Sequence, residues 1–466
     1  MRTPSDSAVA WAQEQFGQAD LGDARRTRRL VHSAACIVEH PAGSLPAKFA
    51  DPADLDAFYR LMNCPTVSHA KLIAAAAAAT LARLRRHHGV VLLLHDTTVL
   101  DHSGLDSIKD LGPIGDGRGR GFYAHNSLAV TADRRVLGLA GQLLHRRRRA
   151  KKGETKEQRR KAPGRESRLW KKACQRIPAA PPGALWVDVG DRGSDITEFL
   201  AYEHRAGRKY VVRSQHNRKV LVEGPDGVVA AAKLHDHVRG LAGGAGPRRR
   251  LDLPATDRRP ARQAELVVAW VKLKVVPPRQ RRGDHGDTPL EVWAVRVWEP
   301  APPAGEEAVE WVLLTNVAVE DEAGAWERVD WYSARWVIEE YHKGQKTGCA
   351  VEGLQFRRRA SLEPAIAVLS VVAVWLLQLR DAGRDEGLRA KPAREAVPEL
   401  WVRVLSAWRH RQARPAWTYG EFVDALARLG GHQNRRSDGP PGWLVLWRGW
   451  AQLQAMIAGA LAVASG

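Results

Sequence analysis

The sequence predicts a mixed α/β protein with helical segments at both ends. Two short segments, the continuous apolar run Val90–Leu94 and the mostly apolar Leu185–Val189, have the length and composition of strands that are buried on both faces of a sheet. Helical periodicity dominates the chain up to about residue 86, it returns from Trp326, and the residues after about 380 have the pattern of an all-helical tail. We therefore expect a sheet in the middle of the chain, with one helical domain before it and another after it.

Residues 1–70 are expected to form the first helical domain. Apolar spacing predicts helices over Ala8–Phe16, Arg25–Val38 and Asp54–Met62, and Asp23 stands where it can cap the second of these. The second helix begins with four closely spaced cations, Arg25, Arg26, Arg28 and Arg29. Such a basic start either contacts DNA or forms a solvated face.

Residues 71–380 are expected to contain the sheet, and residues 381–466 the second helical domain. An Ala-rich helix over Val67–Arg86 leads into the first buried strand. Further strands are predicted at Phe122–Val130, Val136–Leu144 and Tyr210–Arg213, and helices at Arg168–Ile177 and from Ile196. From about 220 to 317 the chain is strand-like and rich in Gly and Pro, which predicts a β-rich insertion in the central domain.

The chain carries a large excess of positive charge. Its 72 Lys and Arg outnumber 52 Asp and Glu, which gives a net charge of +20. A GC-rich genome would raise the share of Arg, Ala, Gly and Pro, but it does not explain the excess over acids. This balance indicates a polyanionic partner, with nucleic acid ahead of an anionic membrane surface.

The positive charge is densest between Arg146 and Lys172, where 14 Lys and Arg stand against 3 Glu. A segment with this composition cannot pack as core, so we expect a flexible loop before the helix near residue 168. The plain interpretation is a solubilising loop. The sign and density of the charge favour contact with phosphates.

Cysteine usage and hydropathy predict a cytoplasmic protein without a membrane span. The four cysteines, Cys36, Cys64, Cys174 and Cys349, are far apart and form no C-x-x-C pair, as in a reducing compartment. The first residues have no apolar signal-peptide core. The longest apolar run, Ala365–Leu379, is shorter than the roughly 18–20 residues that cross a bilayer and is expected to be a buried helix.

Three carboxylates are candidates for a metal site. Asp96 follows the apolar run of the first buried strand by one His, Asp191 follows the second buried strand by one Gly, and Glu339 lies on a predicted helix. Asp188 is a rival for the second acid because it lies within its strand, whereas Asp191 lies in the loop beyond. Converging carboxylates repel one another unless a cation neutralises them. An all-oxygen set selects Mg²⁺ or Mn²⁺, and two such ions can promote phosphodiester cleavage.

The segment around Glu339 carries the most specific pattern in the chain. Tyr332, Arg335, Glu339 and Lys346 have offsets of 0, 3, 7 and 14. On one α-helix these four side chains would fall within a sector of about 60°. That face would combine a metal-binding carboxylate with cationic groups that bind phosphate oxygens.

These residues resemble the DDE transposases of bacterial insertion sequences, in the subgroup marked by a Y-(2)-R-(3)-E-(6)-K signature. Tyr332, Arg335, Glu339 and Lys346 match that spacing without a gap. The family's other blocks are similar to D-T-T at Asp96–Thr98, D-R-x-x-D at Asp191–Asp195, V-V-R-S-x-H-x-R-K at Val211–Lys219, L-G-D-x-R-R-T-x-R-L at Leu21–Leu30 and the helical tail at Leu429–Trp450. The likeness spans most of the chain and is weakest in the arginine-rich loop and the β-rich insertion.

The resemblance implies an RNase H-like core in which Asp96, Asp191 and Glu339 bind two Mg²⁺ or Mn²⁺ ions. It also implies cut-and-paste movement of double-stranded DNA, with a hairpin intermediate on the transposon ends. A homodimer would pair those ends through the C-terminal domain. The DNA-contacting residues that it implies are Tyr332, Arg335 and Lys346 of the signature, Arg213, His216, Arg218 and Lys219 of the strand block, and the four arginines of the N-terminal domain.

The resemblance further implies a stacking pocket for a flipped base at Trp311, 28 residues before Glu339, and Trp336 also matches the pattern. An extruded base needs an aromatic face, and stacking contributes about 1–3 kcal/mol per base. Because Trp311 lies in a strand-like run, a place in the protein core is the alternative interpretation.

Three functions remain in competition at this point. The leading one is an active transposase that cleaves DNA and joins it to a target. The alternatives are a DNA-binding protein descended from a transposase and an RNase H-like nuclease without strand transfer. The presence of all three acids disfavours the first alternative, and an end-binding N-terminal domain disfavours the second.

Overall fold

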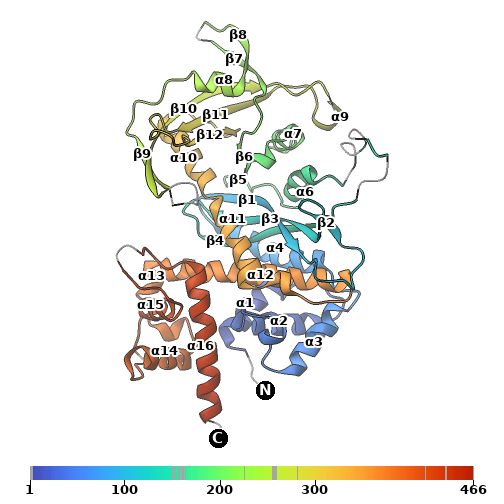
Figure 1. Cartoon of the computed structure of the whole chain (residues 1–466), viewed down its shortest axis with the longest axis vertical. Helices are drawn as coiled ribbons and strands as arrows, with labels where there is room; N and C mark the ends of the chain where they lie inside the picture. The colour runs from blue at the N-terminus through green and yellow to red at the C-terminus, as the bar shows by residue number, and fades with distance from the viewer. Residues whose placement is uncertain are drawn as a thin grey trace.

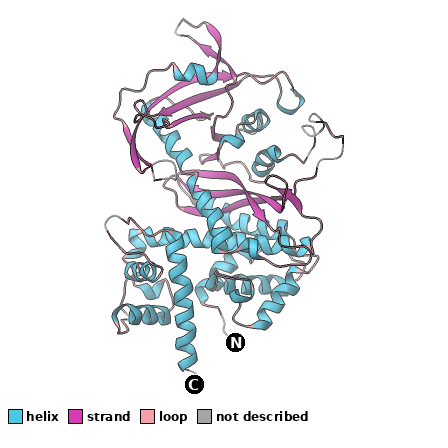
Figure 2. Cartoon of the chain, viewed as in Figure 1, coloured by secondary structure: helices cyan, strands magenta, loops and turns pink. Residues whose placement is uncertain are grey.

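A computed structural model describes residues 4–149, 153–155, 158, 162, 164–224, 226–253, 255, 260–280, 282–414, 416–435 and 438–464. A helical base lies below a layer of strands, and further strands with short helices lie above that layer (Figures 1 and 2). The helices from the two ends of the chain lie together at that base (Figure 1). The predicted mixed α/β class, with helices at both ends of the sequence, is confirmed.

The N-terminal helices follow the predicted periodicity closely. They are α1 (Asp6–Phe16), α2 (Ala24–Glu39), α3 (Pro52–Met62) and α4 (His69–Arg86). Asp23 caps α2, because its carboxylate accepts a hydrogen bond of 2.8 Å from the amide of Arg25. Phe16, Leu30 and Phe58 are fully buried between α1, α2 and α3.

The central sheet has the strand order β4-β3-β1-β5-β6. Its strands are β1 (Val90–Asp101), β2 (Gly112–Ile114), β3 (Gly119–Thr131), β4 (Val136–His145), β5 (Leu185–Gly190) and β6 (Lys209–Arg213), with β2 beside β3. β1 runs antiparallel to β3 and parallel to β5, and β5 runs parallel to β6. The apolar half of β1 was predicted, but the strand continues to Asp101 because its pairing with β3 extends to Asp101↔Gly121. Asp96 therefore lies within a strand and not at its exit.

The strand-rich stretch after β6 joins the same sheet. It contains β7 (Lys219–Glu223), β8 (Val229–Lys233), α8 (Leu234–Arg239), β9 (Arg249–Leu253), β10 (Arg262–Val275), α9 (Arg282–His285), β11 (Leu290–Trp298) and β12 (Glu310–Thr315). β12 pairs antiparallel with β6, from Thr315↔Val211 to Leu313↔Arg213. The described strands thus form one 12-stranded sheet.

Helices cover both faces of the central strands. α6 (Leu169–Cys174) and α7 (Thr197–Arg205) pack on one face through Trp170 and Phe199. The other face is covered by α4, α10 (Glu322–Ser333), α11 (Trp336–Lys343) and α12 (Arg359–Arg384). Among the described helices, α12 is the one long and apolar enough to cross a membrane, but 83% of its most apolar window is buried inside the molecule. The predicted buried helix at Ala365–Leu379 is thus part of the core.

Four helices complete the chain: α13 (Glu386–Arg389), α14 (Glu399–His410), α15 (Tyr419–Leu429) and α16 (Trp443–Ala464). Short helical turns lie at Pro46–Lys48, Glu166–Arg168, Arg192–Ser194, Gly344–Gly348, Val351–Gly353 and Ala393–Glu395. α15 and α16 approach closely at two glycines. A Cβ on Gly449 would lie 1.9 Å from the carbonyl oxygen of Leu426, and one on Gly430 would lie 1.9 Å from that of Val445.

This close approach predicts opposite effects for two Gly-to-Ala substitutions in α16. Gly449→Ala forces the two helices apart and should destabilise the protein by about 1–3 kcal/mol, the usual cost of overpacking. Gly459→Ala meets no atom within 4 Å, so it should stabilise the helix by up to about 1 kcal/mol through helix propensity. Thermal unfolding monitored by circular dichroism measures both changes, and equal shifts would contradict the close contact.

Candidate active site

Three carboxylates lie near one another where β1, β5 and α11 come together. β1 and β5 are parallel neighbours, and their pairing ends at His95↔Gly190. The residues that follow, Asp96 and Asp191, are therefore adjacent across the two strands. α11 packs on β1 and carries Glu339 in its first turn.

The charges of these groups act on one another. Burial, together with the negative charges of Asp191 and Glu339, raises the pKa of Asp96 to about 6, although Arg335 and the amide of Thr97 oppose the shift. The Asp191 carboxylate accepts a hydrogen bond of 2.8 Å from the amide of Gly193, which fixes it at the start of a helical turn. An all-carboxylate set in which one member is reluctant to ionise fits a hard divalent cation.

Arg335 connects two of the three acids. Its guanidinium donates to Asp96 at 3.1 Å and to Glu339 at 2.7 Å. The Arg335 side chain is 13% exposed, so its contact with Asp96 is largely shielded from solvent, whereas Glu339 is 34% exposed. A cationic group thus lies directly between two carboxylates that are candidates for metal ligation.

The prediction that the four signature residues share one α-helix is wrong. Tyr332 lies in the last turn of α10, Arg335 in the turn between α10 and α11, Glu339 in α11, and Lys346 in the wider turn Gly344–Gly348. The amide of Arg335 bonds to the carbonyl of Tyr332, three residues back, which tightens the chain and ends α10. The four-residue spacing of Arg335 and Glu339 is still helical, and it gives their ion pair.

Aromatic side chains surround the signature. The Tyr332 ring is buried and meets Trp311 of β12 edge-on, with 5.5 Å between ring centroids. Trp311 is only partly buried. Trp336 begins α11 and is 60% exposed, and the Arg335 guanidinium lies 5.7 Å from the centre of its ring. An exposed indole beside the carboxylates offers a face on which a base can stack.

The other basic residues predicted to contact DNA differ in their interactions within the protein. Lys346 lies 3.7 Å from Glu352. Arg218 forms an ion pair of 2.7 Å with the buried Asp195 and also binds Thr197, which is a structural role. Arg213 donates to the carbonyl of Glu310 at 3.2 Å. His216 and Lys219, from the same block, are exposed.

The arginines of α2 divide into two pairs. Arg25 and Arg28 are exposed, and Arg25 forms an ion pair with Asp23 at 3.0 Å. Arg26 donates to Thr66 and to the carbonyl of Leu21, and Arg29 binds Asp54 at 2.7 Å. The first pair is available to a partner, whereas the second pair stabilises the domain.

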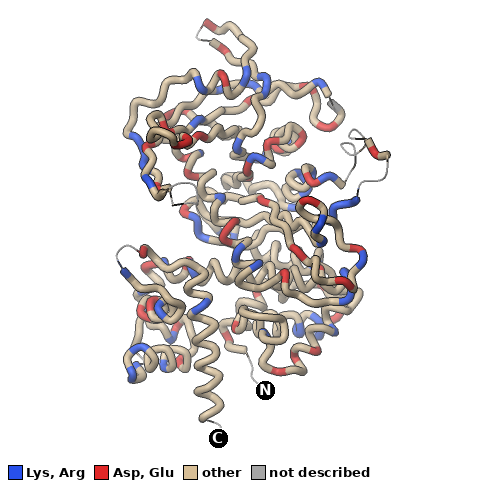
Figure 3. The backbone as a smooth tube through the Cα atoms, in the orientation of Figure 1, with Lys and Arg blue, Asp and Glu red and all other residues tan. Residues whose placement is uncertain are grey.

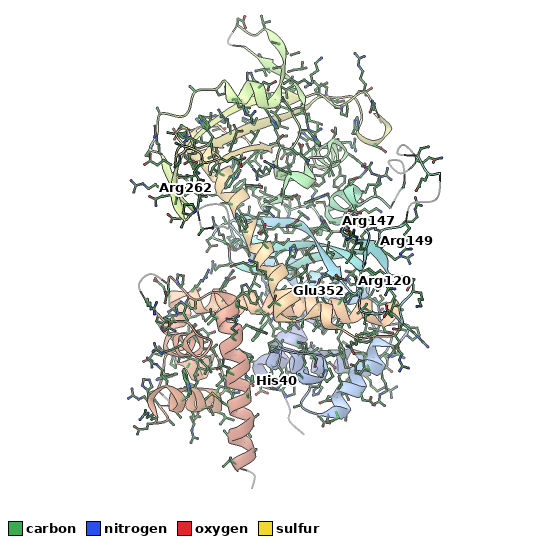
Figure 4. The ribbon with its side chains drawn as sticks, viewed as in Figure 1. His40, Arg120, Arg147, Arg149, Arg262 and Glu352 are labelled. Atoms are coloured by element: carbon green, nitrogen blue, oxygen red, sulfur yellow. The ribbon has the colours of Figure 1, made fainter. Side chains whose placement is uncertain are left out.

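The middle of the predicted basic loop, residues 150–152, 156–157, 159–161 and 163, lies outside the described residues. At its start, Arg147 pairs with Glu166 and its guanidinium lies 4.4 Å from the centre of the Tyr123 ring. Arg147 and Arg149 lie on the same flank of the molecule as Arg120 (Figure 4). Basic segments occur on both sides of the sheet (Figure 3).

Asp188, the rival for the second acid, lies in a different environment. It is fully buried, binds Arg208 at 2.9 Å and accepts a hydrogen bond of 2.7 Å from His95. Burial alone would raise the pKa of Asp188, but Arg208 and His95 hold it well below its usual range. Its carboxylate is already saturated, so the geometry favours Asp191 beside Asp96.

A group of buried polar residues behind the acids was not predicted. Asn126, which pairs with Asp96 across β1 and β3, lies 3.1 Å from Nε2 of His342 and accepts a bond from Gln142. His342 follows Glu339 by one helical turn, and burial lowers its pKa to about 3. The sequence signal was the H-N-S run in an otherwise apolar strand. These neutral groups fix the elements that carry Asp96 and Glu339.

Comparison with known families gives a match at the N-terminus. Residues 8–67 match a family described as transposase DNA-binding. The matched segment covers most of α1 and all of α2 and α3, and it ends two residues before α4. It includes the basic start of α2. The match supports a transposase function and DNA as a partner.

The buried Asp188–Arg208 pair predicts a large loss of stability when it is broken. Arg208→Met should cost about 3–5 kcal/mol, because it leaves the buried Asp188 charge uncompensated. The double variant with Asp188→Leu should recover much of that loss, since both charges are then absent. Urea unfolding measures the difference, with the exposed Arg192→Met as the control. A single variant as stable as the control would contradict this role.

Proposed function

We propose that this protein is a DDE transposase that cleaves DNA at transposon ends and transfers the freed strand into target DNA. The observation that carries the proposal is that Asp96 lies near Asp191 and Glu339, with Arg335 bridging Asp96 and Glu339, in a chain whose N-terminal helices match a transposase DNA-binding family. The strand order β4-β3-β1-β5-β6, with one antiparallel side and one parallel side, supports an RNase H-like core.

Asp96, Asp191 and Glu339 would hold Mg²⁺ or Mn²⁺, in two sites according to the family resemblance. Metal bound there supplies charge neutralisation and an activated attacking oxygen. The chain itself places Asp96 on a strand paired on both sides and Asp191 in a turn closed by its own hydrogen bond to Gly193. Rigid supports of this kind keep the ligands in position.

Arg335 has two competing partners in this proposal. Without DNA its guanidinium neutralises Asp96 and Glu339. When DNA phosphate enters, the same guanidinium can bind a phosphate oxygen, and the carboxylates are then released to ligate metal. Lys346 and Trp336 lie on the same segment, where they would contact the backbone and a stacked base.

The rest of the proposal follows the family resemblance. Residues 1–70 would bind the inverted-repeat ends, residues 71–380 would form the catalytic domain with its β-rich insertion, and residues 381–466 would form the dimer that pairs two ends. Arg25 and Arg28 of α2 are exposed and suited to phosphate contact. The protein would act in the cytoplasm of a bacterium, at the nucleoid.

The three-acid site predicts a sharp separation of binding and cleavage. Asp96→Asn, Asp191→Asn and Glu339→Gln should each lower the cleavage rate by about 10³-fold or more, because several kcal/mol of transition-state stabilisation depend on the metals. Affinity for the DNA that flanks its own gene should change less than about threefold, since binding depends on phosphate contacts elsewhere. Gel-shift and Mg²⁺-dependent cleavage assays measure the two properties.

The exposed Glu307→Gln serves as the control for these variants and should cleave normally. A triad variant that cleaves at the normal rate would refute the metal site. In the same assay, hairpin ends indicate the transposase. Simple nicks indicate an RNase H-like nuclease without strand transfer, and a mobility shift without cleavage indicates a transposase-derived DNA-binding protein.

The position of Arg335 predicts a gain in metal affinity when it is removed. In the DNA-free protein, Arg335→Ala should tighten Mn²⁺ binding by about tenfold, or 1.4 kcal/mol, because the carboxylates lose their internal cation. Arg335→Lys keeps the charge and should stay close to the unmodified protein. Electron paramagnetic resonance of free Mn²⁺ gives the affinities, and an unchanged value for Arg335→Ala would rule out the competition.

A further inference from the structure

A second group of metal-ligating side chains lies far from the three acids, in the N-terminal helices. His32 and Cys36 are one helical turn apart on α2, and Asp54 faces them from α3. Nε2 of His32 lies 3.6 Å from Sγ of Cys36 and 3.0 Å from Oδ2 of Asp54. The three ligand atoms all lie within 4.8 Å of one another.

These separations are close to those of a tetrahedral zinc ion. Zn–N, Zn–S and Zn–O bonds of about 2.0–2.3 Å give a nitrogen–sulfur separation of about 3.6 Å and a nitrogen–oxygen separation of about 3.4 Å. The imidazole and thiol are therefore already placed as a zinc ion requires, and the carboxylate has to retreat by a few tenths of an ångström. A nitrogen, sulfur and oxygen donor set also differs from the all-oxygen set of the three acids, because it favours zinc over magnesium.

A second contact, on the oxygen that does not face His32, orients the Asp54 carboxylate. Arg29 binds the other oxygen of Asp54, Oδ1, at 2.7 Å, so Oδ2 faces the imidazole. Outer hydrogen bonds of this kind hold a metal ligand in place. Arg29 and His32 lie one turn apart on α2, so a single helix supplies the orienting cation and two of the ligands.

The group is also accessible from solvent. Cys36 and Asp54 line a cavity of about 720 Å³ between the N-terminal helices and the C-terminal ones, next to the labelled His40 (Figure 4). His32 is 30% exposed, so an ion can reach the three ligands without unfolding the domain. Glu39 and Asp51 line the same cavity and add negative charge that favours a cation. Three protein ligands beside an open cavity leave the fourth position of a tetrahedral ion for water.

We propose that His32, Cys36 and Asp54 form a zinc site that fastens α2 to α3. On binding, the Cys36 thiol releases its proton to solvent and the thiolate bonds to zinc, with no change in oxidation state. The site lies in the segment that matches transposase DNA-binding domains, so the ion would stabilise the helix that carries the exposed Arg25 and Arg28. This proposal does not depend on catalysis by the three acids.

Cobalt substitution tests the site in the full-length protein after chelation of bound metals. Tetrahedral Co²⁺ with a thiolate ligand gives a near-ultraviolet charge-transfer band, which the three acids cannot produce because they include no sulfur. We expect one equivalent of Co²⁺ to give this band and Zn²⁺ to displace it. Cys36→Ser should abolish the band, and Arg29→Ala should weaken Zn²⁺ binding by about tenfold or more through the lost outer contact.

Two cysteine variants serve as matched controls. Cys64→Ser changes a cysteine of the same domain outside the group, and Cys174→Ser removes the thiol beside His95 and Asp188. Both should keep the band. His32→Gln provides a second ligand variant, so the result does not depend on the folding of Cys36→Ser. No thiolate band in the unmodified protein, or a band that survives in Cys36→Ser, would show that these residues form only an ion pair beside a buried thiol.

Discussion

The candidate active site is constrained by the mutual repulsion of three carboxylates, which requires a neutralising cation. Asp96 is half-buried near Asp191 and Glu339, and its pKa is raised to about 6 as a result. Such a group is stable only with a cation, and Arg335 supplies one from the turn between α10 and α11. The position of that turn, the end of α10 and the close approach of α11 to β1 all serve this neutralisation.

The elements that deliver the acids are held by interactions of a different kind. Behind Asp96, the neutral side chains of Asn126, Gln142 and His342 connect β3, β4 and α11 through hydrogen bonds. On the other side of β1, the Asp188–Arg208 pair joins β5 to the loop before β6. Apart from Arg335, the side chains described here around the acids are neutral. The interactions that hold the fold together therefore do not use the carboxylates of the three acids.

Sequence periodicity was sufficient to predict the helices and buried strands, because the residues of these elements that pack on the core recur at regular intervals. Periodicity failed where tertiary contacts determine the ends of an element or the partner of a side chain. β1 extends past its apolar half because β3 pairs with it as far as Asp101. The signature segment breaks at Arg335 because that residue bonds three positions back and turns toward two acids from different elements. Arg218 resembled a free cation in the sequence, but its partner Asp195 lies 23 residues earlier and is brought near only by folding.

The pairing of β12 with β6 has a mechanical consequence. Trp311 is in β12, and β12 is hydrogen-bonded to a strand that lies one position from β5, which leads to Asp191. A stacked base at Trp311 and a phosphate at the acids would therefore be held by one continuous sheet, with no hinge between them. The position of the flipped base and the position of the cleaved bond would then be a fixed distance apart. The sheet, and not the DNA, would set that distance.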